Sequence, residues 1–249
     1  MGTNGRELLQ LSCRDMFFAH WAVESESLRP WVPTALTLDT FDKKAWIGIV
    51  AFKVAAVDIR TGESSASIAP PFLNINLRTY VIGNDGPGIY FLSSDVESTA
   101  AAAVGHRLFG FAVYQARMKH RNRDGEVIFR SERTDSDTRR KGFKARYEPV
   151  GETFEAEPDS IEEFLIERSR YYIAGEPACS SVGQRTPLPD ERPVRTGEIV
   201  QSSHQLRSTE ADIQLNTLSE GFDLEFMTDE PVLHYCDQWN AGWNPLQSV

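Results

Sequence analysis

The chain has 249 residues, 41% of them hydrophobic and 25% charged, which fits a globular protein with a sizeable core in one large domain or two small ones. No apolar run approaches the roughly 20 residues of a membrane-spanning helix, and residues 1–10 lack the basic and apolar segments of a signal peptide. The net charge of −10 disfavours nucleic acid and anionic membrane as partners.

The first half of the chain is typical of strands joined by tight turns. Apolar alternation and turn residues predict, in chain order, a strand at 8–23, one or two helical turns at 25–32, a hairpin at 36–52 and a hairpin at 72–92. Residues 99–109 are rich in alanine and predict a buried helix.

The second half adds another hairpin at 113–133, which turns at Asp124-Gly125. Residues 159–173 predict a helix capped by Asp159 or Ser160, with acidic residues in its first turn and arginines late. Short closing strands are expected at 144–147, 199–206, 211–215 and 231–235. This order predicts an α+β protein, mainly an antiparallel β-sheet or barrel with a few packed helices, in which residues 1–249 form a single domain.

Short blocks of sequence spread over nearly the whole chain are similar to one known family. They include Ala19-His20-Trp21, Ala45-Trp46-Ile47-Gly48, Asn76-Leu77-Arg78-Thr79-Tyr80-Val81 and Glu230-Pro231-Val232-Leu233-His234-Tyr235. They resemble the YqjF-like family of uncharacterised proteins, in the acetoacetate-decarboxylase-like superfamily. The resemblance implies an acetoacetate-decarboxylase-like β-barrel or cone with helices packed outside and a ligand pocket inside. It permits a homo-oligomer.

One segment, residues 105–114, resembles the Gly-Arg-Glu-x-x-Gly-[aromatic]-Pro-Lys-Lys segment of acetoacetate decarboxylases. In those enzymes the first lysine forms a Schiff base with the β-keto acid, and the second lowers the pKa of the first. The matching positions here are Val113 and Tyr114. Valine has no amine, so the resemblance implies the scaffold without the imine chemistry.

The residues of strand 72–82 give the first candidates for that pocket. Period-2 geometry places Asn76, Arg78 and Tyr80 on one face and their apolar neighbours on the other. If this face lines a barrel interior, Arg78 can bind a carboxylate through two hydrogen bonds. The alternative is an exposed sheet face with a surface arginine.

Three further candidates come from other segments. Tyr114 can donate a hydrogen bond to a developing oxyanion, or it fills the space that a lysine leaves. Arg117 is either a second cation of the pocket or the start of a basic hairpin. His234 in an apolar strand is either catalytic or a hydrogen-bonded core residue. The same two readings hold for His20, and His106 could reach the mouth of the pocket.

Other chemistry finds less support. Lys43 and Lys44 are adjacent but follow a turn, where solvated lysines are expected. No metal or nucleophile signature occurs, so neither a metal nor another cofactor is expected. Cys13, Cys179 and Cys236 are widely spaced, which argues against a disulfide framework and favours the cytoplasm. Acidic residues interrupt the basic stretch 119–146, which favours a solvated hairpin over a nucleic-acid site.

The sequence therefore predicts a protein that binds a small organic acid, with a carboxylate, in its barrel. Two roles stay open: an enzyme that works by acid–base or lyase chemistry without a covalent amine intermediate, or a non-catalytic module that binds or senses a ligand.

Overall fold

The computed structural model describes residues 9–61, 64–100, 102, 113–134, 141–174, 193–222, 230–244 and 246–248. Strands dominate these residues: β1 (Leu9–Val23), β2 (Thr37–Leu38), β3 (Ala45–Thr61), β4 (Ser64–Ala69), β5 (Phe72–Gly83), β6 (Gly86–Val96), β7 (Val113–Arg123), β8 (Glu126–Arg133), β9 (Gly142–Phe154), β10 (Arg170–Ala174), β11 (Val194–Gln201), β12 (Leu206–Asn216), β13 (Val232–Trp243) and β14 (Gln247–Ser248). The helical elements are short: α1 (Ser25–Leu28), η1 (Arg29–Trp31), α3 (Ile161–Ile166) and η2 (Glu220–Phe222).

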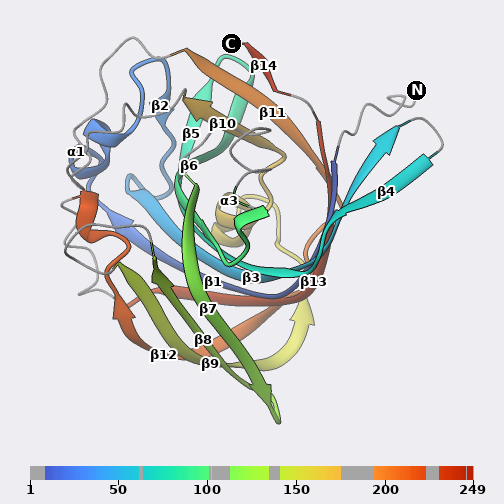
Figure 1. Cartoon of the computed structure of the whole chain (residues 1–249). Coiled ribbons are helices and arrows are strands. Elements are labelled where there is room, and N and C mark those ends of the chain that lie inside the picture. Colours follow the sequence, from blue (N-terminus) through green and yellow to red (C-terminus); the bar gives the residue numbers. More distant parts are fainter. Residues whose placement is uncertain are drawn as a thin grey trace.

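The described strands form one sheet that closes on itself (Figure 1). The strand order is β14-β11-β10-β6-β7-β8-β9-β12-β13-β1-β3-β5-β2, and additional pairings join β11 to β13 and β6 to β5. The two additional pairings close two rings. The larger ring runs through β7, β8, β9 and β12, and the smaller ring runs through β10 and β11. Strands β1, β3, β5, β6 and β13 form a wall that both rings share.

The shared wall is buried on both faces, and its residues alternate between two cores. Phe17, Ile49 and Leu77 belong to the core of the larger ring. Phe18 and Val50 belong to a second core on the other face, inside the smaller ring. Burial on both sides explains why most of residues 16–23 of β1 and most of β3 are apolar, in place of a strict alternation of apolar and polar residues.

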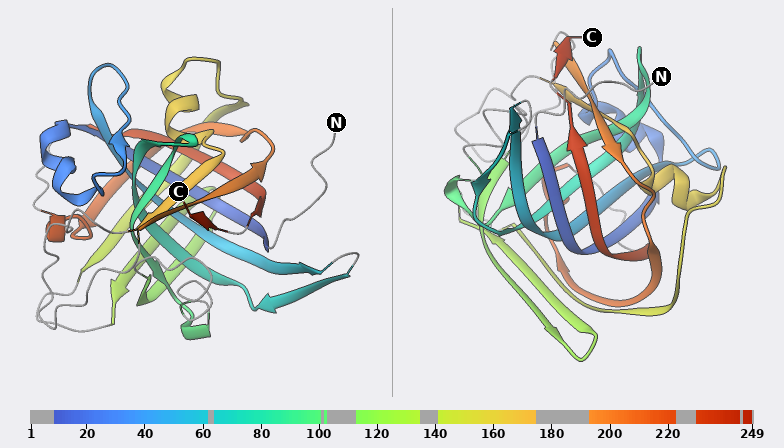
Figure 2. Two further views of the ribbon diagram at one scale, coloured as in Figure 1. Left: turned by 90° about the horizontal axis from the view of Figure 1, so that it is seen from above. Right: turned by 90° about the vertical axis from the view of Figure 1, so that its right-hand side faces the viewer.

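Two hairpins project from this body (Figure 2). The end of β3 leaves the wall together with β4, and β7 with β8 extends in another direction. In the second hairpin, Asp124 (φ 52°) and Gly125 (φ 98°) form the turn. Both residues adopt positive φ, as a two-residue hairpin turn of type I′ requires, and the sequence Asp-Gly permits it.

Most of the strand predictions are confirmed. Strand β1, the β5–β6 hairpin and the β7–β8 hairpin lie where the alternation indicates. The mainly antiparallel barrel is confirmed as well, with parallel pairing only of β6 with β7 and β10 among the described strands. Of the hairpin expected at 36–52, the turn between Phe41 and Lys44 and the strand from Ala45 are confirmed. The pairing of its first arm is wrong, because Thr37–Leu38 pairs with β5 and not with β3. The helix expected at 99–109 lies mostly outside the described residues.

The helix expected at 159–173 is wrong in its length. Ser160 is the N-cap, and its hydroxyl accepts a hydrogen bond from Glu163 N at 3.1 Å, as expected. Helix α3 ends at Ile166, because Glu167 leaves the helical conformation with ψ at 47°. The aromatic and β-branched residues that follow pair in β10 instead. Sheet pairing thus overrides the favourable charge pattern of a longer helix.

Candidate functional site

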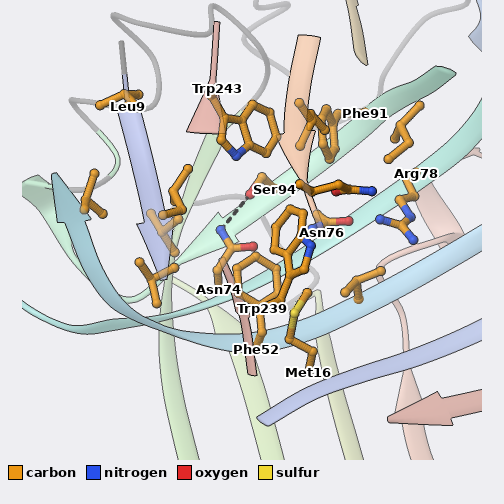
Figure 3. A pocket seen from close by; sticks show the side chains of 18 of the residues that line it. Leu9, Met16, Phe52, Asn74, Asn76, Arg78, Phe91, Ser94, Trp239 and Trp243 are labelled. Carbon is orange, nitrogen blue, oxygen red and sulfur yellow. Dashed lines mark hydrogen bonds between the residues drawn. The ribbon is translucent and has the colours of Figure 1, made fainter. Parts of the chain in front are cut away.

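A cavity of about 140 Å³ lies inside the smaller ring (Figure 3). Strands β1, β3, β4, β5, β6, β7, β11 and β13 line it, together with the end of α3. Its walls are mainly apolar and include Phe18, Val50, Phe91, Ile199 and Trp239. The volume is comparable with that of cavities that hold a single benzene ring.

Arg78 brings a buried positive charge to this cavity. The side chain, on β5, is 7% exposed, and its Nη2 donates to Leu165 O at 3.0 Å. Its Nε has no hydrogen-bond partner, and its Cζ lies 5.7 Å from the centroid of the Phe18 ring. Among the described residues, no carboxylate lies within 4.0 Å of Arg78. Arg168 also lines the cavity, but it is paired with Asp39 at 2.9 Å.

Tyr80 and His20 form a hydrogen-bonded pair next to Arg78, on Leu165 O, which also accepts from Arg78. The Tyr80 hydroxyl lies 2.7 Å from Leu165 O and 2.8 Å from His20 Nε2. Because a carbonyl can only accept, the hydroxyl proton goes to Leu165, and His20 Nε2 must donate to Tyr80. Burial, then the charges of Arg78 and His234, hold the pKa of His20 well below its ordinary 6.5. His20 is therefore a neutral ring that positions Tyr80 beside Arg78.

Amide groups add polar atoms along the same wall. Asn74 Nδ2 donates to Ser94 Oγ at 2.9 Å. The Oδ1 atom of Asn76 is buried without a partner. Figure 3 shows Asn76 and Arg78 pointing from neighbouring positions of β5 into the space beside Trp239. The indole Nε1 of Trp239 is likewise buried without a partner. These atoms are a donor and an acceptor that a bound molecule can satisfy.

Beside Phe18 and Trp239, His204 and Glu167 form a close pair. His204 lines the cavity and is 3% exposed. Its Nδ1 lies 2.9 Å from Glu167 Oε1, and its backbone N donates to the same oxygen at 2.7 Å. Burial opposes the charge of Glu167, but the hydrogen bonds and charge of His204 outweigh burial and lower the pKa of that carboxyl below its ordinary 4.5. The pair is thus an imidazole held in place by a carboxylate.

The residues expected from the sequence fall into two groups. Asn76 and Arg78 line the cavity. Tyr80 is not a lining residue but lies next to Arg78, whose Cζ is 5.8 Å from the centroid of the tyrosine ring. Tyr114, Arg117 and His234 are not among the lining residues.

Tyr114, Arg117 and His234, which do not line the cavity, have other contacts or are exposed. Arg133 stacks on Tyr114 at 3.8 Å, on the opposite side of β7 from Val113. Arg117 is exposed. His234 is buried with its Nε2 3.4 Å from Glu162 Oε1, and burial lowers its pKa although Glu162 opposes the shift.

The cavity wall has Val113 at the position that matches the Schiff-base lysine. All six lysines of the chain lie in the described part, and none of them lines the cavity. The position is therefore on the cavity wall, as the resemblance implies, with an apolar side chain in place of an amine.

Sequence reasoning missed several lining residues. Asn74 could have been found, because it precedes Asn76 by two residues on the same strand face. The pairing of Glu167 with His204 had no sequence signal, since the two residues lie 37 positions apart in the chain. Trp239 lies in β13 beyond the predicted closing strand.

No helix in the described ranges is long and apolar enough to cross a membrane. In the same part of the chain, no group of three or more His, Cys, Asp or Glu side chains is arranged to hold a metal ion.

Solved structures with the same fold are acetoacetate-decarboxylase-like. Acetoacetate decarboxylase from Legionella pneumophila subsp. pneumophila str. Philadelphia 1 matches with a TM-score of 0.64 and 11% identity over 100% of this chain and 90% of that chain. The enduracididine biosynthesis enzyme MppR complexed with pyruvate matches with 0.62 and 11% identity over 100% and 91%. An acetoacetate decarboxylase-like enzyme from Sphingomonas wittichii RW1 gives 0.60 and 12% over 98% and 94%. At such identities the likeness shows the fold alone.

Similarity in sequence is closer to proteins without a known activity. The uncharacterized protein YqjF of Bacillus subtilis (strain 168) is 30% identical over 244 residues, which are 98% of this chain and 93% of that protein. The model of the DUF2071 family, described as an uncharacterized conserved protein, matches residues 10–240. The chain therefore belongs to the DUF2071 family, on an acetoacetate-decarboxylase-like fold.

Proposed function

We propose that this protein binds a small carboxylic acid in the cavity of the smaller ring, with the carboxylate on Arg78 and an apolar body against the opposite walls. The observation that carries the proposal is the state of Arg78: a guanidinium that is 7% exposed, with an unpartnered Nε and no carboxylate in salt-bridge distance among the described residues.

The energetics of Arg78 support an anionic ligand. Removing a guanidinium from water costs several kcal/mol, and a carboxylate partner normally offsets that cost. Here Leu165 O and the Phe18 ring supply only part of the compensation. A ligand carboxylate can accept two parallel hydrogen bonds from the guanidinium, and these bonds are strong in a site with little water.

The remaining walls indicate the rest of the ligand. Phe91, Ile199 and Trp239 offer apolar surface, and the volume of about 140 Å³ admits a body the size of a phenyl ring or a short alkyl chain. The Schiff-base route of acetoacetate decarboxylase is not part of the proposal, because no lysine lines the cavity.

Isothermal titration calorimetry tests the proposal with benzoate, phenylacetate and hexanoate, and with benzyl alcohol as a neutral counterpart. We expect the acids to bind at least about tenfold more tightly than the alcohol, since a hydrogen bond to a charged group contributes about 1.5–3 kcal/mol. Arg78→Met should remove this preference.

The matched control is Arg117→Met, because Arg117 is an exposed arginine that does not line the cavity. This variant should bind the acids as the wild type does. Unchanged acid affinity in Arg78→Met, or no binding of any acid by the wild type, would contradict the proposal. An acid that binds and is recovered unchanged under all conditions favours a binding or sensing module over an enzyme.

A further inference from the structure

The pair formed by Glu167 and His204 has the geometry of an acid–base dyad. Both Nδ1 and the backbone N of His204 point at Oε1 of Glu167, at 2.9 Å and 2.7 Å. Gln201 Nε2 lies 3.4 Å from the second oxygen of Glu167. Because the carboxylate can only accept, His204 Nδ1 carries a proton, and in the neutral ring Nε2 is left with a lone pair.

The Nε2 atom of His204 is the nitrogen of the dyad that remains available to a ligand. His204 lines the cavity, and no hydrogen-bond partner of its Nε2 occurs among the described residues. Phe18 is near both this histidine and the cation: its ring centroid is 6.1 Å from that of His204 and 5.7 Å from the Cζ of Arg78. A small acid held on Arg78 therefore occupies the same cavity as the imidazole.

Trp239 supplies a third group at the same place. Its indole ring stacks on His204, with centroids 5.1 Å apart and planes at 16°. Its Nε1–H is buried without a partner and lines the cavity. An unpaired N–H beside a base is suited to donate a hydrogen bond to an oxygen on which negative charge develops.

We propose that His204, positioned by Glu167, moves a proton on an aryl-substituted 2-keto acid whose carboxylate lies on Arg78. The proposal rests on the ligand site proposed above and adds a substrate class and a catalytic residue. The aryl ring fits the apolar walls, and the keto oxygen can accept from Trp239 Nε1.

The proposed step is a keto–enol tautomerisation, which needs no oxidant, metal or covalent intermediate. His204 Nε2 takes a proton from C3 of the acid, and the electron pair of the broken C–H bond forms the C2=C3 double bond. The carbonyl pair moves onto the keto oxygen, which becomes an enolate. The imidazolium, stabilised by Glu167, then protonates that oxygen to give the enol, or its N–H first exchanges with solvent and the ring returns a solvent-derived proton to C3, so that deuterium enters C3 in D₂O.

Phenylpyruvate in D₂O is the probe, and deuterium incorporation at C3 is followed by NMR against a buffer blank. We expect wild-type protein to accelerate exchange and His204→Gln to lose at least about a hundredfold of that acceleration, as expected for general acid–base catalysis. Glu167→Gln should lower the exchange rate less and alter its pH profile, whereas Arg78→Met should raise KM. Glu167→Asp should restore part of the Glu167→Gln loss.

A second measurement does not depend on a substitution. Diethyl pyrocarbonate should modify His204 of the wild-type protein, as mapped by peptide mass spectrometry, and benzoate should slow the modification. If His204 does not react, the inference that its Nε2 is free is contradicted, even if His204→Gln fails to fold.

The outcomes separate this inference from the ligand site. Binding of phenylpyruvate without exchange above the blank overturns the dyad and leaves the acid site standing, as does equal exchange in His204→Gln. Binding of benzoate without binding of phenylpyruvate overturns the substrate class. Failure of every acid to bind removes the acid site and the dyad with it.

Discussion

The buried side chain of His20, next to Arg78, should make the stability of the protein depend on pH. Its ring is fully buried, and burial together with Arg78 and His234 holds its pKa well below 6.5. The unfolded chain therefore takes up a proton below pH 6.5 that the native ring does not. The free energy of unfolding should fall by about 1.4 kcal/mol per pH unit as pH drops below that value, down to the native pKa. Urea unfolding of wild type and His20→Gln between about pH 5 and pH 7 measures the difference in slope.

Tyr80→Phe provides the control for this pH effect. The substitution removes the hydrogen bonds to His20 and Leu165 but keeps the burial that dominates the pKa shift. We expect it to lower the free energy of unfolding by about 1–3 kcal/mol at neutral pH, with the acid slope of the wild type retained. Burial also lowers the pKa of His234 and His120, so part of the slope should remain in His20→Gln. Loss of the slope in Tyr80→Phe, or an unchanged slope in His20→Gln, would show that His20 does not cause it.

At the scale of the elements, strand β3 must carry a glycine where it passes between His20 and Arg78. Gly48 pairs with both residues in the sheet register. A Cβ atom there would lie 2.5 Å from His20 Cδ2 and 2.7 Å from Nε2, and the bond to Tyr80 keeps that ring from moving. We expect Gly48→Ala to destabilise the protein by about 1–3 kcal/mol in urea unfolding.

A double-mutant cycle tests this cause. In His20→Ala the space beside residue 48 is open, so adding Gly48→Ala should cost much less than it does in the wild type. Equal costs in both backgrounds would mean that backbone preference and not the contact with His20 requires the glycine.

Helix α3 connects stability to the site, because Leu165 near its end accepts hydrogen bonds from Arg78 and Tyr80. Ser160→Ala removes the N-cap bond to Glu163 and should lower the free energy of unfolding by about 1 kcal/mol. It should also weaken benzoate binding, since Leu165 orients Arg78. Ser160→Asp caps equally well and should restore both properties; calorimetry and urea unfolding check them together.

At the scale of the whole molecule, local pattern predicted most of the barrel. Alternation and turn residues were enough for β1, β5 to β8 and the face of β5 that carries Asn76 and Arg78. The length of α3 was not predictable, because β10 is formed by pairing with β11 and β6, which the local sequence does not encode.

The candidate site was predictable only where it lies on one strand. Asn76 and Arg78 follow from the period of β5, whereas the dyad joins Glu167 after α3 to His204 before β12. Tyr114 was assigned to the pocket by its match to a lysine, yet the strand alternation of β7 puts Val113, not Tyr114, on the cavity wall. Closure of the ring brings together residues from distant segments, and a pattern within one segment cannot predict those contacts.

The closed smaller ring also lets us predict the effect of placing a lysine amine at position 113, which matches the Schiff-base lysine of acetoacetate decarboxylases. Val113→Lys places an amine on the wall of the cavity that contains Arg78, where burial and the like charge should lower the pKa of the lysine and make it nucleophilic. Borohydride reduction with acetoacetate should then leave an adduct at residue 113, found by peptide mass spectrometry, and the wild type should give none above the level of exposed lysines. Tyr114→Lys is the matched control, because that position lies on the opposite side of β7, where Arg133 stacks on Tyr114. An adduct on the wild type, or an equal adduct in both variants, would show that the cavity does not select the position of the amine.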